Sequence, residues 1–216
     1  MLKVEGLQVM IKGFVILREV SLEIPRGGLV GLVGRNGAGK TTTLKGIMGL
    51  IPVTGGTITL DGTDLVQVPG HKRAPLGIGY MPEDRRLIGA LTVEDNILMP
   101  AWATGRTDDR KRLAYIYEIM PDVAALAKRR ASALSGGQQK MVALARAVMT
   151  GTKLLLLDES FEGLSPAIGE KFAGTIQRLQ REGIGVLIAE SDTKRLGFVK
   201  RIYTIERGEI VQASGT

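Results

Sequence analysis

The chain places three glycines, a lysine and two threonines within residues 34–42 (GRNGAGKTT). The spacing is G-x-x-x-x-G-K-[ST], a pattern that binds nucleotide phosphates when a strand precedes it and a helix follows. Glycines let backbone N–H groups converge on phosphate oxygens, and the positive end of a following helix strengthens the attraction. The predicted phosphate-binding residues are Gly34, Arg35, Asn36, Gly37, Ala38, Gly39, Lys40, Thr41 and Thr42.

The polar side chains of this stretch have distinct expected roles. Lys40 would bridge the β- and γ-phosphates, Thr41 would bind Mg²⁺, and Thr42 would bond the α-phosphate. The alternative is a Gly-rich turn between a strand and a helix that carries a solvated lysine. The expected strand before the loop and helix after it favour the phosphate site.

A second chemical signal closes the apolar run at residues 153–159 (KLLLLDE). An acid at the end of a strand beside a phosphate loop can hold magnesium through water, which predicts this role for Asp158. Glu159 is then placed to polarise an attacking water molecule. Two acids at a solvent-facing strand end are the alternative, and the phosphate loop makes the catalytic reading the better one.

The elements that must position these residues alternate between strand and helix patterns. This alternation is typical of an α/β fold with a mainly parallel sheet. The runs at 29–34, 153–159 and 185–190 are continuously apolar, as expected of strands covered on both faces. The opening to about residue 24, with residues 55–62, predicts a separate antiparallel lobe. Apolar residues at helical spacing over 110–120 and 138–149 predict a helical insertion.

Composition narrows the class of protein. With 216 residues, 44% hydrophobic and 24% charged, the chain can bury a core as a folded domain. Aromatic residues make up 4%, which disfavours stacking on single-stranded bases. The net charge of +7 suits nucleic acid, an anionic membrane surface or a nucleotide. Cysteine is absent, and no signal-peptide pattern or apolar run of about 18 residues occurs, so we expect a cytosolic chain.

A second glycine cluster, residues 134–138 (LSGGQ), lies between the phosphate loop and the two acids. Ser135, Gly136 and Gly137 precede an amphipathic helical pattern, so backbone N–H groups and a helix start face an anion here too. For SGG alone, a helix cap in a flexible loop would be the simpler explanation. The three motifs in this order resemble the ATP-binding cassette (ABC) ATPases, and the resemblance covers essentially the whole chain.

This resemblance implies an α/β fold of the P-loop NTPase class and ABC ATPase type. A single domain would span residues 1–216, with an antiparallel β lobe and a RecA-like core at about 1–90 and 150–216. The helical lobe would occupy about 91–149. The resemblance further implies that two protomers sandwich two molecules of ATP with Mg²⁺. The residues that would bind the γ-phosphate held by the other protomer are Ser135, Gly136, Gly137 and Gln138.

Other stretches resemble the parts of this family that contact partners. Residues 161–166 (FEGLSP) correspond to the D-loop at the partner's site, and residues 78–91 to the Q-loop that links ATP to membrane subunits. MPEDRR followed by LTVEDNI resembles the branched-chain (hydrophobic) amino acid importer subgroup. The resemblance implies an ATPase that powers such an importer from the inner face of the cell membrane, attached through transmembrane permease subunits.

Four positions depart from the general family pattern. Glu83 stands at the Q-loop glutamine, where it would bring a further carboxylate to the metal. Ser160 replaces a proline, and Ser191 replaces the switch histidine that contacts the γ-phosphate. The base-stacking position falls on Ile11, with Phe14 as a nearby alternative. Because a serine reaches less far and carries no charge, we expect a heterodimer with a second ABC ATPase subunit, with a homodimer as the alternative.

Two other functions stay open. A soluble ABC ATPase that acts on nucleic acid or the ribosome would suit the basic charge, although such relatives usually carry two cassettes or a long coiled-coil insertion. A catalytically weak regulatory subunit would suit Ser191.

Two residues outside these motifs have simpler expectations. Trp102 follows an apolar stretch at the edge of the predicted helical lobe, and we expect core packing rather than a partner contact. His71, the single histidine, lies in a polar loop and is expected to be a solvated surface residue.

Overall fold

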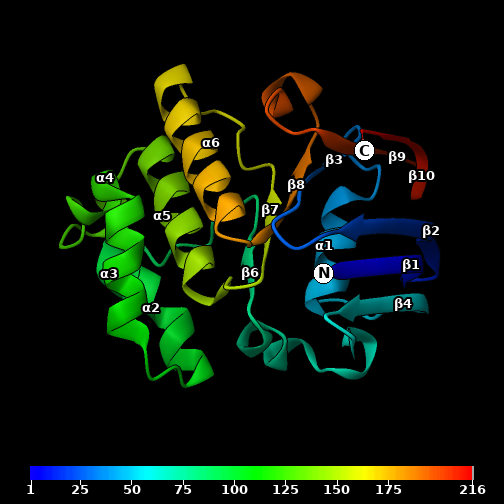
Figure 1. Ribbon diagram of the computed structural model, residues 1–216, viewed down its shortest axis with the longest axis horizontal. Helices are drawn as coiled ribbons and strands as arrows, with labels where there is room; N and C mark the ends of the chain where they lie inside the picture. Colours follow the sequence, from blue (N-terminus) through cyan, green and yellow to red (C-terminus); the bar gives the residue numbers. More distant parts are fainter. Residues whose placement is uncertain (216) are drawn as a thin grey trace.

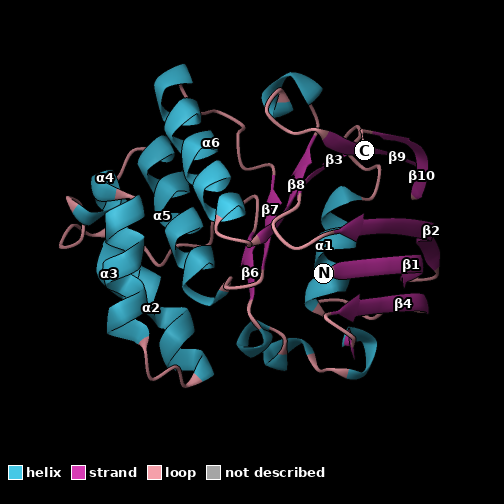
Figure 2. Cartoon of the chain, viewed as in Figure 1, coloured by secondary structure: helices cyan, strands magenta, loops and turns pink. Residues whose placement is uncertain are grey.

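The computed structural model describes residues 1–215, which form two sheets with helices against them (Figures 1 and 2). The smaller sheet is antiparallel, in the order β2-β1-β4-β5. Its strands are β1 (Leu2–Ile11), β2 (Phe14–Ile24), β4 (Gly55–Leu60) and β5 (Thr63–Asp64). None of the helices in residues 1–215 is long and apolar enough to cross a membrane.

The larger sheet has the order β10-β9-β3-β8-β7-β6. Its neighbouring strands are parallel, except that β10 pairs antiparallel with β9 at one edge. The strands are β3 (Leu29–Val33), β6 (Ile78–Met81), β7 (Leu154–Asp158), β8 (Gly185–Glu190), β9 (Arg201–Glu206) and β10 (Glu209–Ser214). A mixed α/β fold with one antiparallel and one mainly parallel sheet agrees with the sequence prediction.

The continuous apolar run of β7 is explained by burial on both of its faces. Leu154 and Leu156 pack into a core shared with the antiparallel sheet and helix α1 (Lys40–Met48). Leu155 and Leu157 point the other way, into a core formed with the remaining helices. Since successive side chains of a strand alternate between faces, a strand between two cores needs apolar residues at every position.

The helical part lies on the far side of the larger sheet from the antiparallel sheet (Figure 1). Four of its helices lie between β6 and β7 in the chain, and the fifth connects β7 to β8. They are α2 (Val93–Thr104), α3 (Asp109–Ile119), α4 (Pro121–Ala124), α5 (Gly136–Thr150) and α6 (Pro166–Arg181).

Local sequence signals set the ends of these helices. The Thr92 hydroxyl accepts the Asp95 N–H at the start of α2, and Gly105 ends that helix in the left-handed conformation at φ 66°. At the start of α6, Pro166 occupies the first turn, where its missing N–H costs nothing.

The prediction that Trp102 packs into the core is wrong. Its side chain is 54% exposed. Trp102 lies in the last turn of α2, where Ala101 is the last buried residue, so the helix extends past the core at this end. His71 is exposed, as expected.

Arg73 is a buried cation that the sequence did not single out. It is 4% exposed and binds the end of α1, the helix that begins at the phosphate loop. Its guanidinium donates to the carbonyls of Gly46 at 2.8 Å, Ile47 at 2.7 Å and Val68 at 2.9 Å. Arg73 therefore supplies a donor to the Ile47 carbonyl in the last turn of α1 and a second donor to the Gly46 carbonyl, which also accepts the Gly49 N–H.

Replacing Arg73 by methionine, which retains apolar bulk, should destabilise the fold. We expect Arg73→Met to lower the free energy of unfolding by about 2–4 kcal/mol, because buried carbonyls lose their donors. Urea unfolding measures this change, and Lys72→Met, at an exposed neighbour, is the matched control. Equal stabilities of the two variants would contradict the role given to Arg73.

Candidate active site

The candidate site lies where the carboxyl ends of β3, β7 and β8 meet. Val33 of β3 pairs with Glu190 of β8, and Asp158 of β7 pairs with Ala189 of β8. The ladder continues one residue further, since the Glu159 N–H donates to the Ala189 carbonyl at 2.9 Å. This register brings the phosphate loop, the two acids and the end of β8 to the same edge of the sheet.

Two glycines of the phosphate loop, Gly34 and Gly39, occupy positions that a larger residue could not. Gly39 has φ 115°, and a Cβ there would lie 2.7 Å from Leu17 Cδ2. A Cβ at Gly34 would lie 2.3 Å from the Ile205 carbonyl oxygen. Lys40 Nζ is held inside the loop, donating to the Gly34 carbonyl at 2.7 Å. Gly34 and Gly39 are therefore required by the fold around the loop as well as by a phosphate.

A cavity of about 390 Å³ opens in front of this loop and unites most of the predicted residues. The predicted residues Gly34, Arg35, Ala38 and Asp158 are not part of its lining, and neither are Ile11 and Phe14, the two proposed base-stacking residues. Ile16 and Glu162 line it without having been predicted. The full lining consists of Ile16, Asn36, Gly37, Gly39, Lys40, Thr41, Thr42, Glu83, Glu159, Glu162 and Ser191.

Asp158 and Thr41 form a compact set of oxygen donors. The Thr41 hydroxyl donates to Asp158 Oδ1 at 3.0 Å, and the Tyr80 hydroxyl donates to Oδ2 at 3.3 Å. Burial raises the pKa of Asp158 to about 6, and the charges of Glu83 and Glu159 add to this, while both hydrogen bonds oppose it. A hydroxyl and a carboxylate side by side fit Mg²⁺, which takes a few protein oxygens and keeps waters or phosphates as its other ligands.

Glu159 has two differently placed carboxylate oxygens. Oε1 lies 3.1 Å from Lys40 Nζ as an ion pair, with a geometry that makes no hydrogen bond. Oε2 accepts from the Ser191 N–H at 3.3 Å and from the Ser191 hydroxyl at 3.2 Å. The backbone at Glu159 is left-handed, with φ 43°, an uncommon conformation for a non-glycine residue, and its side chain lines the cavity. Ser191 therefore contacts the acid itself.

Three charged residues behind Glu159 were missed by the sequence analysis. Lys140 of α5 donates to the carbonyls of Glu159 at 2.8 Å and Glu162 at 2.5 Å, and so fixes the segment after β7. Glu190 has 0% exposure; burial raises its pKa to about 7, and the nearby charge of Glu159 contributes. Arg195 lies beside it and opposes that shift. A lysine within the buried face of a helix and an acid ending an apolar strand were the available signals.

The second glycine cluster does not reach this cavity within one chain. Ser135 and Gln138 form a reciprocal capping box that starts α5. A Cβ at Gly137 would lie 2.6 Å from Ile168 Cδ1, so a larger residue there would require the end of the Ile168 side chain to move. None of residues 135–138 lines the cavity.

Comparisons with known proteins agree with this geometry. Residues 17–162 match the family described as ABC transporter. The chain is 37% identical to the high-affinity branched-chain amino acid transport ATP-binding protein BraG of Pseudomonas aeruginosa, over 90% of this chain and 84% of BraG. It is 34% identical to the lipopolysaccharide export system ATP-binding protein LptB of Escherichia coli K12, over 95% of this chain and 86% of LptB.

A solved structure resembles the whole chain. The dimeric structure of a post-hydrolysis state of the ATP-binding cassette MJ0796, bound to ADP and Pi, superposes with a TM-score of 0.88 at 26% identity. The match covers 100% of this chain and 98% of MJ0796. The fold predicted from the sequence is confirmed by this likeness.

Asp158 should cost the protein stability at neutral pH. Because its pKa is raised from 3.8 to about 6, its contribution to folding is full below pH 3.8 and is lost as the pH rises through 6. Asparagine keeps the oxygen that accepts from Thr41 and cannot ionise. We expect Asp158→Asn to raise the free energy of unfolding at pH 8 by about 1–3 kcal/mol, with little change near pH 4.

Urea unfolding without nucleotide or divalent metal at the two pH values checks this prediction. Glu170→Gln, at an exposed carboxyl on α6, is the control and should leave stability unchanged at both. An asparagine variant less stable than the wild type at pH 8 would show that the Asp158 carboxylate is favourably bound.

Proposed function

Because this chain belongs to the ABC transporter family, we propose that it is the ATPase subunit of an importer for branched-chain or other hydrophobic amino acids or amides. The chain is an ATP hydrolase that powers a transporter, as its family and its likeness to the post-hydrolysis structure of MJ0796 indicate. The substrate class is supported by the 37% identity to BraG. The 34% identity to LptB makes lipopolysaccharide export the competing assignment.

The observation that carries the proposed chemistry is the meeting of Lys40, Asp158 and Glu159 at one edge of the sheet. Phosphate oxygens of ATP would take the place of Glu159 as the partner of Lys40. This exchange would free Glu159 Oε1 to accept a hydrogen bond from water and direct it in line at the γ-phosphate. Thr41 and Asp158 would hold Mg²⁺, with Glu83 close by, and the metal would neutralise charge that develops on the phosphate oxygens.

A second ATPase protomer would complete the site. Residues 135–138 lie outside the cavity of their own chain. The Ser135 and Gln138 N–H groups are used by the capping box, so the backbone N–H groups of Gly136 and Gly137 would face a γ-phosphate held by a partner. Lys140, two residues after Gln138, binds the Glu159 and Glu162 carbonyls of its own chain and thus connects the signature helix α5 to the segment after β7. Ser191 in place of histidine favours a different ABC ATPase as the partner, with a second copy as the alternative.

The permease subunits would dock on the loop that follows β6 and on the end of α2. The buried Asn96 side chain ties this loop to α2, accepting the Ile88 N–H at 2.8 Å and donating to the Ile88 carbonyl at 3.1 Å. The Ile88 side chain is nevertheless 45% exposed, and Trp102 is 54% exposed. Large apolar side chains held at the surface suit a partner. Such docking would place the chain at the inner face of the membrane.

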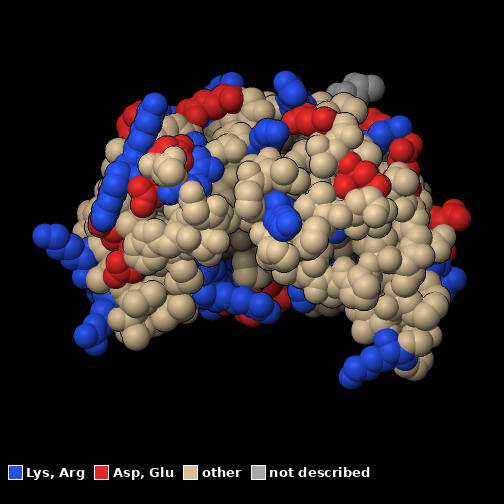
Figure 3. All heavy atoms as spheres, turned by 90° about the horizontal axis from the view of Figure 1, so that it is seen from below, with Lys and Arg blue, Asp and Glu red and all other residues tan. Residues whose placement is uncertain are grey.

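The two alternatives of the sequence analysis have less support. On the face shown in Figure 3, basic and acidic side chains are interspersed rather than gathered into the basic stripe typical of nucleic-acid binding. A catalytically weak regulatory subunit remains the other candidate, because Ser191 brings no charge to Glu159.

The proposed chemistry predicts that one variant loses ATP binding and that another keeps binding but loses turnover. Lys40→Ala should weaken ATP binding, because the ammonium no longer faces the phosphates. Glu159→Gln should bind ATP but lose turnover by about 100-fold or more, as when a catalytic acid–base group is removed. Binding of a fluorescent ATP analogue and phosphate release at several chain concentrations check both. Unchanged turnover in Glu159→Gln would remove Glu159 from the reaction.

The docking surface predicts an effect confined to the assembled transporter. Ile88→Asp and Trp102→Ser should leave ATP affinity of the isolated chain unchanged, since neither residue lines the ATP cavity. Both should reduce copurification with the permease subunits and uptake of labelled leucine in vesicles by about 10-fold or more. Val211→Ser, at an exposed apolar residue on β10, is the control. Normal transport by both variants would place the permease elsewhere.

A further inference from the structure

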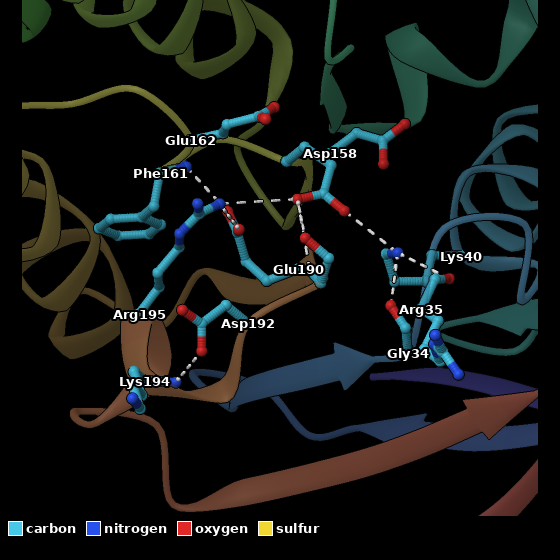
Figure 4. Close-up of polar contacts among 12 residues, drawn as sticks. Gly34, Arg35, Lys40, Asp158, Phe161, Glu162, Glu190, Asp192, Lys194 and Arg195 are labelled. Atoms are coloured by element: carbon cyan, nitrogen blue, oxygen red, sulfur yellow. Dashed lines mark hydrogen bonds and ion pairs between the residues drawn. The ribbon is translucent and has the colours of Figure 1, made fainter.

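Arg195 places a positive charge beside Glu159 from the short helix at Thr193–Leu196, directly after β8. Its Nη1 lies 3.2 Å from Glu190 Oε2 and 3.9 Å from Glu159 Oε2. Figure 4 shows the Arg195 side chain reaching towards the Glu190 carboxylate. Within residues 1–215, the cations within 4 Å of the Glu159 carboxylate are Lys40 and Arg195.

Glu190 anchors this arginine. The Glu190 side chain is fully buried, and its Oε1 accepts the Phe161 N–H at 2.8 Å. Phe161 is itself buried between Phe172 and Phe198, with ring centroids 5.0 and 5.6 Å away. A carboxylate held on one oxygen by a rigid backbone donor fixes the guanidinium bound to its other oxygen. Arg195 is therefore positioned by the core, although its side chain is 31% exposed.

The two oxygens of Glu159 divide between two sets of partners. Oε1 faces Lys40, on the side of the phosphate loop. Oε2 faces Ser191 and Arg195. Once Lys40 binds phosphate, the contacts at Oε2 would remain to orient the Glu159 carboxylate. Ser191 contributes neutral donors there, and the positive charge comes from Arg195.

We propose that Arg195, held by Glu190, is a positioning residue that fixes the Glu159 carboxylate for hydrolysis and supplies the cation that Ser191 lacks. This inference rests on the proposed role of Glu159. Arg195 would provide, from the same chain, the positive charge at Glu159 Oε2 that Ser191 does not provide.

The test compares Arg195→Ala, Arg195→Lys and the adjacent exposed control Lys194→Ala. For Mg-ATP hydrolysis, we expect Arg195→Ala to lower kcat about 10–100-fold, the scale of a displaced catalytic group, with KM and ATP affinity unchanged. Arg195→Lys should retain more of the activity, and Lys194→Ala should match the wild type. The rates are compared well below the unfolding temperature of each variant, because Arg195→Ala also removes the cation bound to the buried Glu190 carboxylate.

A second comparison uses Glu190→Gln, which keeps an oxygen for the Phe161 N–H. The double variant combines Glu190→Gln with Arg195→Ala. If Glu190 acts through Arg195, its kcat should equal that of the less active single variant, because the two losses of kcat do not multiply. Fully multiplicative losses would mean that the two residues act separately and would overturn the anchoring role.

Two results separate this inference from the proposed function. An unchanged kcat in Arg195→Ala, or a loss of ATP affinity as large as the loss of kcat, would overturn the role of Arg195 alone. ATP binding by the wild type without turnover, even with copurified partner subunits, would overturn the hydrolytic role of Glu159 and the positioning role together.

Discussion

The parallel alignment of β3, β7 and β8 is the constraint on which the site depends. Their pairing puts Val33 level with Glu190, and Asp158 level with Ala189, so the chain leaves all three strands at one edge. A slip of one residue in β7 would exchange the two faces of the strand and move Asp158 away from Thr41. Apolar residues on both faces of β7 oppose such a slip only weakly, so the packing of particular side chains in two different cores must hold the register.

The site also concentrates charge where water is scarce. Glu159 and Glu190 are both buried, and Lys40, Lys140 and Arg195 surround them. Burial of like charges is costly unless cations and hydrogen bonds accompany them. The basic groups differ in what they contact: Lys140 binds backbone carbonyls, whereas Lys40 and Arg195 face carboxylates. In the proposed reaction, this division would let Lys40 change partner while the remaining contacts stay in place.

The same edge is connected to the helical part through backbone carbonyls. Arg146 of α5 donates to the carbonyls of Arg85 and Arg86, both of which have left-handed backbones at φ 59° and 50°. Arg85 in turn donates to the Gly136 carbonyl at 3.4 Å, at the start of α5. The loop proposed to meet the permease is thus in direct contact with the helix proposed to meet the partner's ATP. A movement of either one would strain the other.

The sequence determined what depends on neighbours along the chain. The spacing from Gly34 to Thr41, the capping of α5 and the apolar run before Asp158 follow from local backbone geometry, and these identified the fold and the phosphate loop. Contacts between distant segments were decided by the tertiary structure. The approach of Ser191 and Arg195 to Glu159, and the burial of Arg73, depend on strand register and packing. Trp102 is exposed because α2 extends beyond the core, and the pattern of apolar residues within α2 does not indicate where the core ends.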